Sequence, residues 1–144
     1  KRDWSSDVCS SDLDAKGNAA AYSLSMGQLF GARKMVPGTG MLLAAVTGEN
    51  TWVSPLVIAN PGNGEFRFAG AGGGSTEAAF ATGAIARATV EGRQPVGVAL
   101  TQRGGQGGYV NAIACPDGIR GGSYQCQTAI DPAGSGLALV APVR

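Results

Sequence analysis

The segment FRFAGAGGGSTEAAFATGAIARATVEG, residues 66–92, changes its hydrophobic period once, and this change limits what the chain can fold into. Before the glycines, Phe66 and Phe68 alternate with charged residues, which is the pattern of an antiparallel strand with one wet face. After the glycines, Ser75 can cap a helix, alanines line that helix, and Gly92 stands where it should stop. The segment therefore predicts a strand, a glycine turn and one helix that lies close against a sheet.

Upstream of this segment, the run NAAAYSLS, residues 18–25, alternates with a period of two. Tyr22 and Leu24 share a large apolar face, which suits a core. Ser23 and Ser25 share the other face, which is small and polar and suits a surface that something must approach closely. The run therefore predicts a strand with its large face inward.

Further apolar runs are separated by turn residues. SPLVIA and EFRFAG are joined by NPGNG, which carries strong turn chemistry and predicts a hairpin. The other runs are MLLAAV after VPGTG, YVNAIAC and QCQTAI around the cysteines, and GLALVAPV near the C-terminus. Residues 94–108 have no clear pattern and predict a loop. Strands, one helix and further strands without an internal repeat predict one α+β domain over residues 14–144.

The opening KRDWSSDVCSSDL, residues 1–13, contains no apolar run and resembles neither a secretory signal nor a strand. The stretch from Trp4 to Leu13 can be written with the codons TGG AGT TCA GAC GTG TGC TCT TCC GAT CTN, which resemble a sequencing-library adapter read in one frame. We therefore expect residues 1–13 to be an adapter-derived artefact, disordered and without specific packing contacts. The natural chain would then begin upstream of Asp14.

Charge and composition exclude several classes of function. The formal net charge is +1, no basic stripe for nucleic acid is present, and no apolar run approaches the roughly 20 residues of a membrane-spanning helix. Histidine is absent, which removes the commonest general base and the commonest zinc ligand. The sequence predicts no cofactor and no metal. Its 24 glycines make an unusually small-residue core, which favours a missing partner that buries more surface.

Cys115 and Cys126 flank PDGIRGGSYQ and can close a small loop. A metal pair and a redox pair are the functional alternatives, but the spacing does not fit CxxC and no further ligands stand nearby in the sequence. A structural disulfide is the favoured interpretation, and it implies an oxidising compartment such as a periplasm or the cell exterior.

The glycines before Ser75 are the best candidate for chemistry, because free N–H groups at a helix start form a site for negative charge. A dinucleotide site would need glycine where Ser75 stands, and a phosphate loop would need the lysine of GK[ST]. An oxyanion hole requires only that adjacent N–H groups point at one developing charge. A plain turn in a glycine-rich protein is the structural alternative.

Several motifs, taken in order, resemble the small subunit of gamma-glutamyltransferases, also called glutathione hydrolases. DAKGNAAAYSLSMGQLFGARKMVPGTGMLLA is similar to the opening strand, phenylalanine-glycine step and G-x-x-L-L turn of that subunit. SPLVIA, AGGGS, VNAIACPDG and AIDPAGSGLA are similar to its serine-proline strand, its glycine pair and its closing strands. The resemblance implies an N-terminal-nucleophile hydrolase fold, an αββα sandwich made by self-cleavage of a precursor. This chain would be a fragment that lacks its partner, the large subunit.

The resemblance also implies which residues act. The family's nucleophile is the threonine freed at the start of the small subunit, whose own α-amine serves as base. Its position falls on Asp7, so the nucleophile is missing and the chain as given should be inactive. Gly73 and Gly74 match the oxyanion glycines, and Ser25 matches a hydroxyl that supports the nucleophile. Thr51 keeps one hydroxyl of a substrate-binding serine pair.

Two departures concern the substrate. Gly27 stands where the family usually has a substrate-binding asparagine, and AAVTGEN replaces an asparagine pair with its following aspartates. The implied function is cleavage of gamma-glutamyl amides such as glutathione through an acyl-threonine, in a periplasmic or secreted enzyme. The alternatives are an N-terminal-nucleophile amidase with another substrate and a non-catalytic secreted β-rich module.

Overall fold

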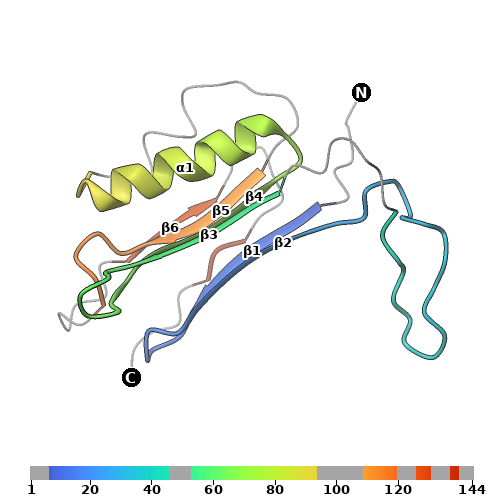
Figure 1. Cartoon of the computed structure of the whole chain (residues 1–144), viewed down its shortest axis with the longest axis horizontal. Coiled ribbons are helices and arrows are strands. Elements are labelled where there is room, and N and C mark those ends of the chain that lie inside the picture. Colours follow the sequence, from blue (N-terminus) through green and yellow to red (C-terminus); the bar gives the residue numbers. More distant parts are fainter. Residues whose placement is uncertain (1–6, 46–52, 94–108, 120–125, 131–136, 140–144) are drawn as a thin grey trace.

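In the computed structural model, the described residues are 7–45, 53–93, 109–119, 126–130 and 137–139 (Figure 1). They form one helix and two antiparallel sheets, as the sequence predicts for an α+β chain. The first sheet contains β1 (Asp7–Leu13) and β2 (Ala19–Ser25). The second has the order β3-β4-β5-β6, and its strands and helix are β3 (Val53–Ala59), β4 (Phe66–Gly73), α1 (Thr76–Val90), β5 (Tyr109–Ala114) and β6 (Gln127–Ile130).

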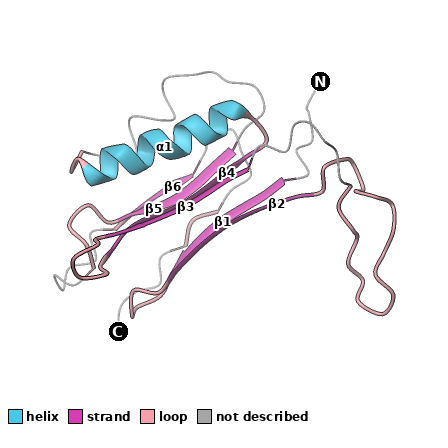
Figure 2. Ribbon diagram, in the orientation of Figure 1, coloured by secondary structure: helices cyan, strands magenta, loops and turns pink. Residues whose placement is uncertain are grey.

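The elements lie in three layers (Figure 2). α1 packs against one face of the four-stranded sheet, and the β1–β2 sheet covers the other face. The layer order of the described residues is therefore helix, sheet, sheet. The αββα sandwich of an N-terminal-nucleophile hydrolase, which the resemblance implies, remains a prediction.

β4 is an interior strand of the four-stranded sheet, and all of its residues except Arg67 are buried. On its helix side, the core consists of Phe68, Ala78, Ile85, Ala86, Val110, Ala112, Ala114 and Ala129. On its other side, Phe66, Ala69 and Cys115 are buried, with Leu13, Ala19, Ala21, Ile113, Ile119 and Cys126 packed around them. Both clusters consist mainly of alanine and other small residues, as the composition predicts, so the layers can approach closely.

A β-bulge in the β3–β4 hairpin places Phe66 and Phe68 on opposite faces of the sheet, whereas their alternation with charged residues predicts one shared face. Ile58 pairs with Phe68, but Ala59 pairs with Phe66, so Arg67 is the extra residue of β4. The extra residue sends Phe68 into the cluster under α1 and Phe66 into the cluster under the β1–β2 sheet. The expected wet face is also wrong, because the Arg67 side chain is 26% exposed and donates to the Pro116 carbonyl oxygen.

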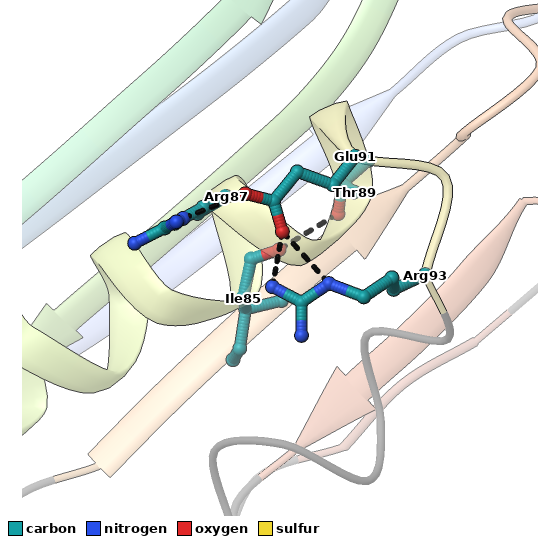
Figure 3. A network of polar contacts seen from close by, with 5 residues as sticks. All are labelled: Ile85, Arg87, Thr89, Glu91 and Arg93. Carbon is teal, nitrogen blue, oxygen red and sulfur yellow. Dashed lines mark hydrogen bonds and ion pairs between the residues drawn. The ribbon is translucent and has the colours of Figure 1, made fainter.

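The helix begins and ends where the sequence predicts. The Ser75 hydroxyl accepts a hydrogen bond from the Ala78 N–H at 3.3 Å. At the other end Gly92 has φ +67, and the N–H of Arg93 donates to the Ala88 carbonyl, which is a Schellman-type stop. The Glu91 carboxylate binds Arg87 and Arg93 (Figure 3), and these hydrogen bonds lower the pKa of that carboxyl.

β2 faces the opposite way to the expectation. Tyr22 and Leu24 are 42% and 61% exposed, whereas Ala19 and Ala21 pack against the second sheet. The expectation that the large face forms the core is therefore wrong for this chain. The glycine- and alanine-rich β4 lies beneath β2, and only the small face allows the two sheets to approach this closely.

The opening of the chain is more ordered than the sequence suggests. Residues 7–13 form β1, which pairs along its whole length with β2, from Asp7 opposite Ser25 to Leu13 opposite Ala19. The expectation that residues 1–13 are wholly disordered and make no packing contacts is wrong for these seven residues. Backbone pairing explains the difference, because an extended segment can donate and accept along a strand edge whatever its side chains are. Trp4 lies outside the described residues.

The described parts of two apolar runs do not form sheet strands. Residues 41–45 of MLLAAV lie in an excursion over residues 26–45, hereafter the arm, whose two limbs meet at an isolated bridge between Met35 and Leu42, and Val46 falls outside the described residues. Of GLALVAPV, residues 137–139 are described and are not in a strand, and the remainder of the run falls outside the described residues. No helix in the described part of the chain is long and apolar enough to cross a membrane.

The predicted disulfide between Cys115 and Cys126 is present. Cys115 is 1% exposed and Cys126 packs beside it, so the bridge ties the end of β5 to the start of β6 within the core. The formation of this disulfide confirms the interpretation of the cysteine spacing.

Reduction of this disulfide should lower the free energy of unfolding by about 3 kcal/mol, since the open loop regains conformational entropy in the unfolded chain. Urea titrations of oxidised and reduced protein measure the difference. The matched control is Cys126→Ala, which should be no more stable in oxidising than in reducing buffer. Two reactive thiols at positions 115 and 126 in oxidised, denatured protein would contradict the bridge.

Candidate functional site

The glycine turn between β4 and α1 forms the centre of the candidate site. Gly73 is the last residue of β4 and lies opposite Val53 on one side and Tyr109 on the other. Gly74 has left the strand, with φ +92, and Ser75 caps the helix. A backbone turn with this φ needs glycine. The turn places both glycines directly before the positive end of the helix dipole.

The β1–β2 sheet approaches this turn through a serine. The Ser23 hydroxyl donates to the carbonyl oxygen of Gly72 at 3.1 Å. Ser25 lies two residues further along the same face of β2 and accepts a hydrogen bond from the Gly27 N–H at 3.0 Å. The small face of β2 is thus the approachable face that the sequence predicts, and what approaches it is the glycine strand.

The direction of the strands brings three predicted features to one end of the layers. Ala19 and Ala21 pack against the cluster that contains Phe66 and Ala69, whereas Ser23 reaches Gly72 nearer the end of β4, so β2 and β4 run in the same direction. Ser25 therefore continues along β2 toward the end of the sheet where β4 gives way to the glycine turn. The backbone of position 7 pairs with Ser25. The predicted nucleophile position, the supporting hydroxyl and the glycine turn share this end.

Two hydroxyls that the sequence analysis did not single out also lie at the turn. The Ser54 hydroxyl of β3 is 3.3 Å from the Gly72 carbonyl oxygen and 3.2 Å from Thr82 Oγ1 on α1. Thr82 is 1% exposed and donates to the Ala78 carbonyl oxygen at 2.8 Å. A polar residue on the alanine face of a helix was the available signal for Thr82. The predicted Thr51 lies outside the described residues.

The described residues supply little charge to this site. No group of three or more metal-ligating side chains gathers among them, and the side chains whose hydrogen bonds meet at Gly72 are hydroxyls. Such an arrangement can donate hydrogen bonds to a developing oxyanion, but it contains neither a strong base nor a nucleophile of its own. Chemistry at the turn therefore requires a reactive group from elsewhere, and position 7 is the nearest predicted source.

The β1–β2 turn carries a carboxylate with a perturbed pKa. Asn18 donates to Asp14 from its side chain at 2.7 Å and from its backbone at 2.9 Å, and the N–H of Lys16 adds a third bond. These bonds hold the pKa of Asp14 below its usual value, with the Asn18 side chain as the largest cause. Because the pKa of Asp14 is lower in the folded than in the unfolded state, its carboxylate stabilises the fold. This stabilisation is fully present above the unfolded-state pKa and is lost as the pH falls through the folded-state pKa.

An NMR titration of the Asp14 carboxyl carbon should therefore give a pKa below the ordinary aspartate value, and Asn18→Ala should move that pKa upward. Lys16→Ala keeps every backbone bond and serves as the control, which should leave the pKa nearly unchanged. An Asp14 that titrates at its ordinary value in the folded protein would contradict the turn geometry.

The comparison with solved structures finds chains of the same fold. Two structures of gamma-glutamyltranspeptidase from Pseudomonas nitroreducens match with a TM-score of 0.62 and 16% identity. One is a highly active tryptophan-to-aspartate mutant, which covers 94% of this chain and 99% of its own, and the other is a complex with L-DON, at 93% and 99%. The chain has a gamma-glutamyltranspeptidase fold.

A third gamma-glutamyltranspeptidase, a threonine-to-alanine mutant from Helicobacter pylori, matches with a TM-score of 0.55 at 15% identity, over 88% of this chain and 99% of its own. Neither the family models nor the curated proteins compared with the sequence match it. The similarity to the gamma-glutamyltranspeptidases is therefore one of fold, and it agrees with the small-subunit resemblance of the sequence motifs.

Proposed function

We propose that this chain is the small-subunit part of a gamma-glutamyltransferase-like enzyme, which cleaves gamma-glutamyl amides such as glutathione. The observation that carries the proposal is the meeting of three features at one end of a gamma-glutamyltranspeptidase fold: Ser25, the backbone of position 7 and the glycine turn. An acyl transfer needs a nucleophile, a base and an oxyanion site, and these features provide a place for each.

In the proposed reaction, a threonine at position 7 begins the mature subunit. Its hydroxyl attacks the gamma-glutamyl carbonyl carbon while its own α-amine takes the proton. The N–H groups of Gly73 and Gly74 stabilise the negative oxygen, and Ser25 supports the nucleophile. The amine product leaves with the proton, and water or an amino acceptor then releases the glutamyl group from the threonine.

Asp7 at that position makes the present chain inactive under this proposal. An aspartate has no hydroxyl, and here its amino group is tied up in a peptide bond. The supporting residues cannot replace a nucleophile, since they contribute only binding and charge stabilisation.

The proposed partner is the large subunit of the same precursor. The outer face of the β1–β2 sheet exposes Val8, Tyr22 and Leu24, at 57%, 42% and 61%. The arm exposes further apolar side chains, namely Leu29, Phe30, Met35, Met41, Leu42 and Leu43. Exposed apolar surface of this extent is typical of an interface and supports the view that a second subunit covers it. The disulfide supports a periplasmic or secreted location.

Self-cleavage tests the proposal. The upstream coding sequence should be joined to this chain with Asp7→Thr, and the precursor followed by gel and N-terminal sequencing. The expected result is two fragments, of which the smaller begins with the new threonine. The matched control carries alanine at position 7 and should stay uncleaved. A threonine precursor that also stays intact would contradict the proposed function.

A further inference from the structure

A chain of hydroxyl groups at the end of β4 links all three layers of the fold. Ser23 comes from the β1–β2 sheet, Ser54 from β3 and Thr82 from α1, and the first two lie within hydrogen-bond distance of the Gly72 carbonyl oxygen. Ser23 is 49 residues from Gly72 in the sequence, and Ser54 is 18 residues away. Two strands therefore converge on one backbone carbonyl, next to the glycine turn, and α1 joins them through the contact between Thr82 and Ser54.

We propose that Ser23 and Ser54 are positioning residues, which hold the Gly72 carbonyl and thereby set the direction of the Gly73–Gly74 backbone. The inference rests on the proposed function, because it concerns the glycines that would form the oxyanion hole. Neither serine touches the substrate in this scheme. Both act through the peptide group between Gly72 and Gly73.

The planarity of the peptide bond transmits the effect. The Gly72 carbonyl and the Gly73 N–H belong to one rigid plane and point in opposite directions. A hydrogen bond that fixes the carbonyl oxygen therefore fixes the N–H as well. Donation to the carbonyl also polarises the same peptide group, which makes its N–H a stronger donor.

Glycine creates the need for such a restraint. Gly72, Gly73 and Gly74 follow one another without a side chain, and glycine loses more conformational freedom on folding than any other residue. Strand pairing restrains Gly72 and Gly73, but Gly74 lies beyond the strand. The serine hydroxyls bind the Gly72 carbonyl oxygen, so they add restraint to the peptide group that leads into Gly73 and Gly74.

The close approach of the hydroxyls also explains why position 72 is glycine. A Cβ atom there would lie 2.5 Å from Thr82 Oγ1, 2.8 Å from the Ala78 carbonyl oxygen and 2.8 Å from Ser54 Oγ. The Thr82 hydrogen goes to Ala78, so Thr82 Oγ1 is left as an acceptor for Ser54. Ser54 has one hydrogen and shares it between Thr82 and Gly72.

Amide hydrogen exchange of the full chain tests the positioning directly. Ser23→Ala and Ser54→Ala should each speed exchange at Gly73 and Gly74 by roughly 5- to 10-fold, the equivalent of one ordinary hydrogen bond. The Ile85 amide in the helix core should keep its rate, which shows that the variant is folded. Ser10→Ala, a serine of β1 opposite Tyr22, is the matched control and should behave like the parent chain.

Ser23→Thr keeps the hydroxyl and should restore slow exchange at both glycines. The same variants in a self-cleaved enzyme with threonine at position 7 should lower kcat by roughly 5- to 10-fold with little change in KM, and Ser23→Thr should recover it. Unchanged glycine exchange in both alanine variants would overturn the proposal, as would faster exchange with an unchanged kcat. An inert parent enzyme would refute the proposed function alone, and glycine exchange would still decide whether the hydroxyls fix the turn.

Discussion

Residues 1–144 as given should release no product from a chromogenic gamma-glutamyl anilide, whereas the self-cleaved enzyme with Asp7→Thr should turn it over. The expected ratio of rates is on the order of 10⁶, by analogy with the loss of a serine protease nucleophile. The reason is that the glycine turn and Ser25 can lower the barrier only after a nucleophile has reached the carbonyl carbon. A spectrophotometric assay of both proteins measures the ratio.

The control for this assay is Asp7→Ser in the same precursor, because serine keeps a hydroxyl at the mature N-terminus. This variant should retain part of the activity, while Asp7→Ala should have none. Turnover by the unaltered chain, after removal of contaminating enzymes, would contradict the missing-nucleophile argument and the role assigned to position 7.

Phe68→Ala should lower the free energy of unfolding by about 4 kcal/mol, the largest loss expected from a single side chain in this fold. Phe68 is fully buried between β4 and α1, where the surrounding residues are mainly alanines. Such small neighbours have few atoms with which to fill the cavity, so most of the cavity should remain empty. Chemical denaturation of the parent and the variant measures the difference.

Phe80→Ala is the matched control, since Phe80 lies on α1 but is 73% exposed, and its loss should lower the free energy of unfolding by less than about 0.5 kcal/mol. Phe66→Ala adds a test of the β-bulge. Because Phe66 lies in the other cluster, the losses from Phe66→Ala and Phe68→Ala should add. If the double variant loses much less free energy of unfolding than the sum of the two single losses, both rings lie in one cluster, which would contradict the bulge.

Features set by local sequence were predictable. The helix start at Ser75 and its stop at Gly92 follow from caps, and NPGNG folds as the expected turn between β3 and β4. The disulfide was also predictable, because two cysteines close in sequence leave few other partners. Each of these features depends on residues that are near one another along the chain.

Features set by contacts between distant segments were not predictable. β1 forms by backbone pairing, which leaves no mark in its side chains, and the direction in which β2 faces is decided by the glycines of β4. The bulge at Arg67 is one extra residue that alternation alone does not reveal.

The candidate site divides in the same way. The glycine turn could be singled out from the strand, glycines and helix in sequence, and the small face of β2 from its alternation. The roles of Gly73, Gly74 and Ser25 came from the family resemblance and remain predictions. The Ser23 and Ser54 hydroxyls could not be placed at the turn, because their hydrogen bonds join segments tens of residues apart.

The central claim is that a gamma-glutamyl group passes through a threonine at position 7, beside the glycine turn. The most direct measurement is mass spectrometry of the self-cleaved Asp7→Thr enzyme, quenched with acid during turnover of a gamma-glutamyl anilide and digested to peptides. The account predicts that the peptide beginning at position 7 gains the mass of one glutamyl group, and that Asp7→Ala gains none. Turnover with an unmodified N-terminal peptide, or a glutamyl group on another residue, would contradict it.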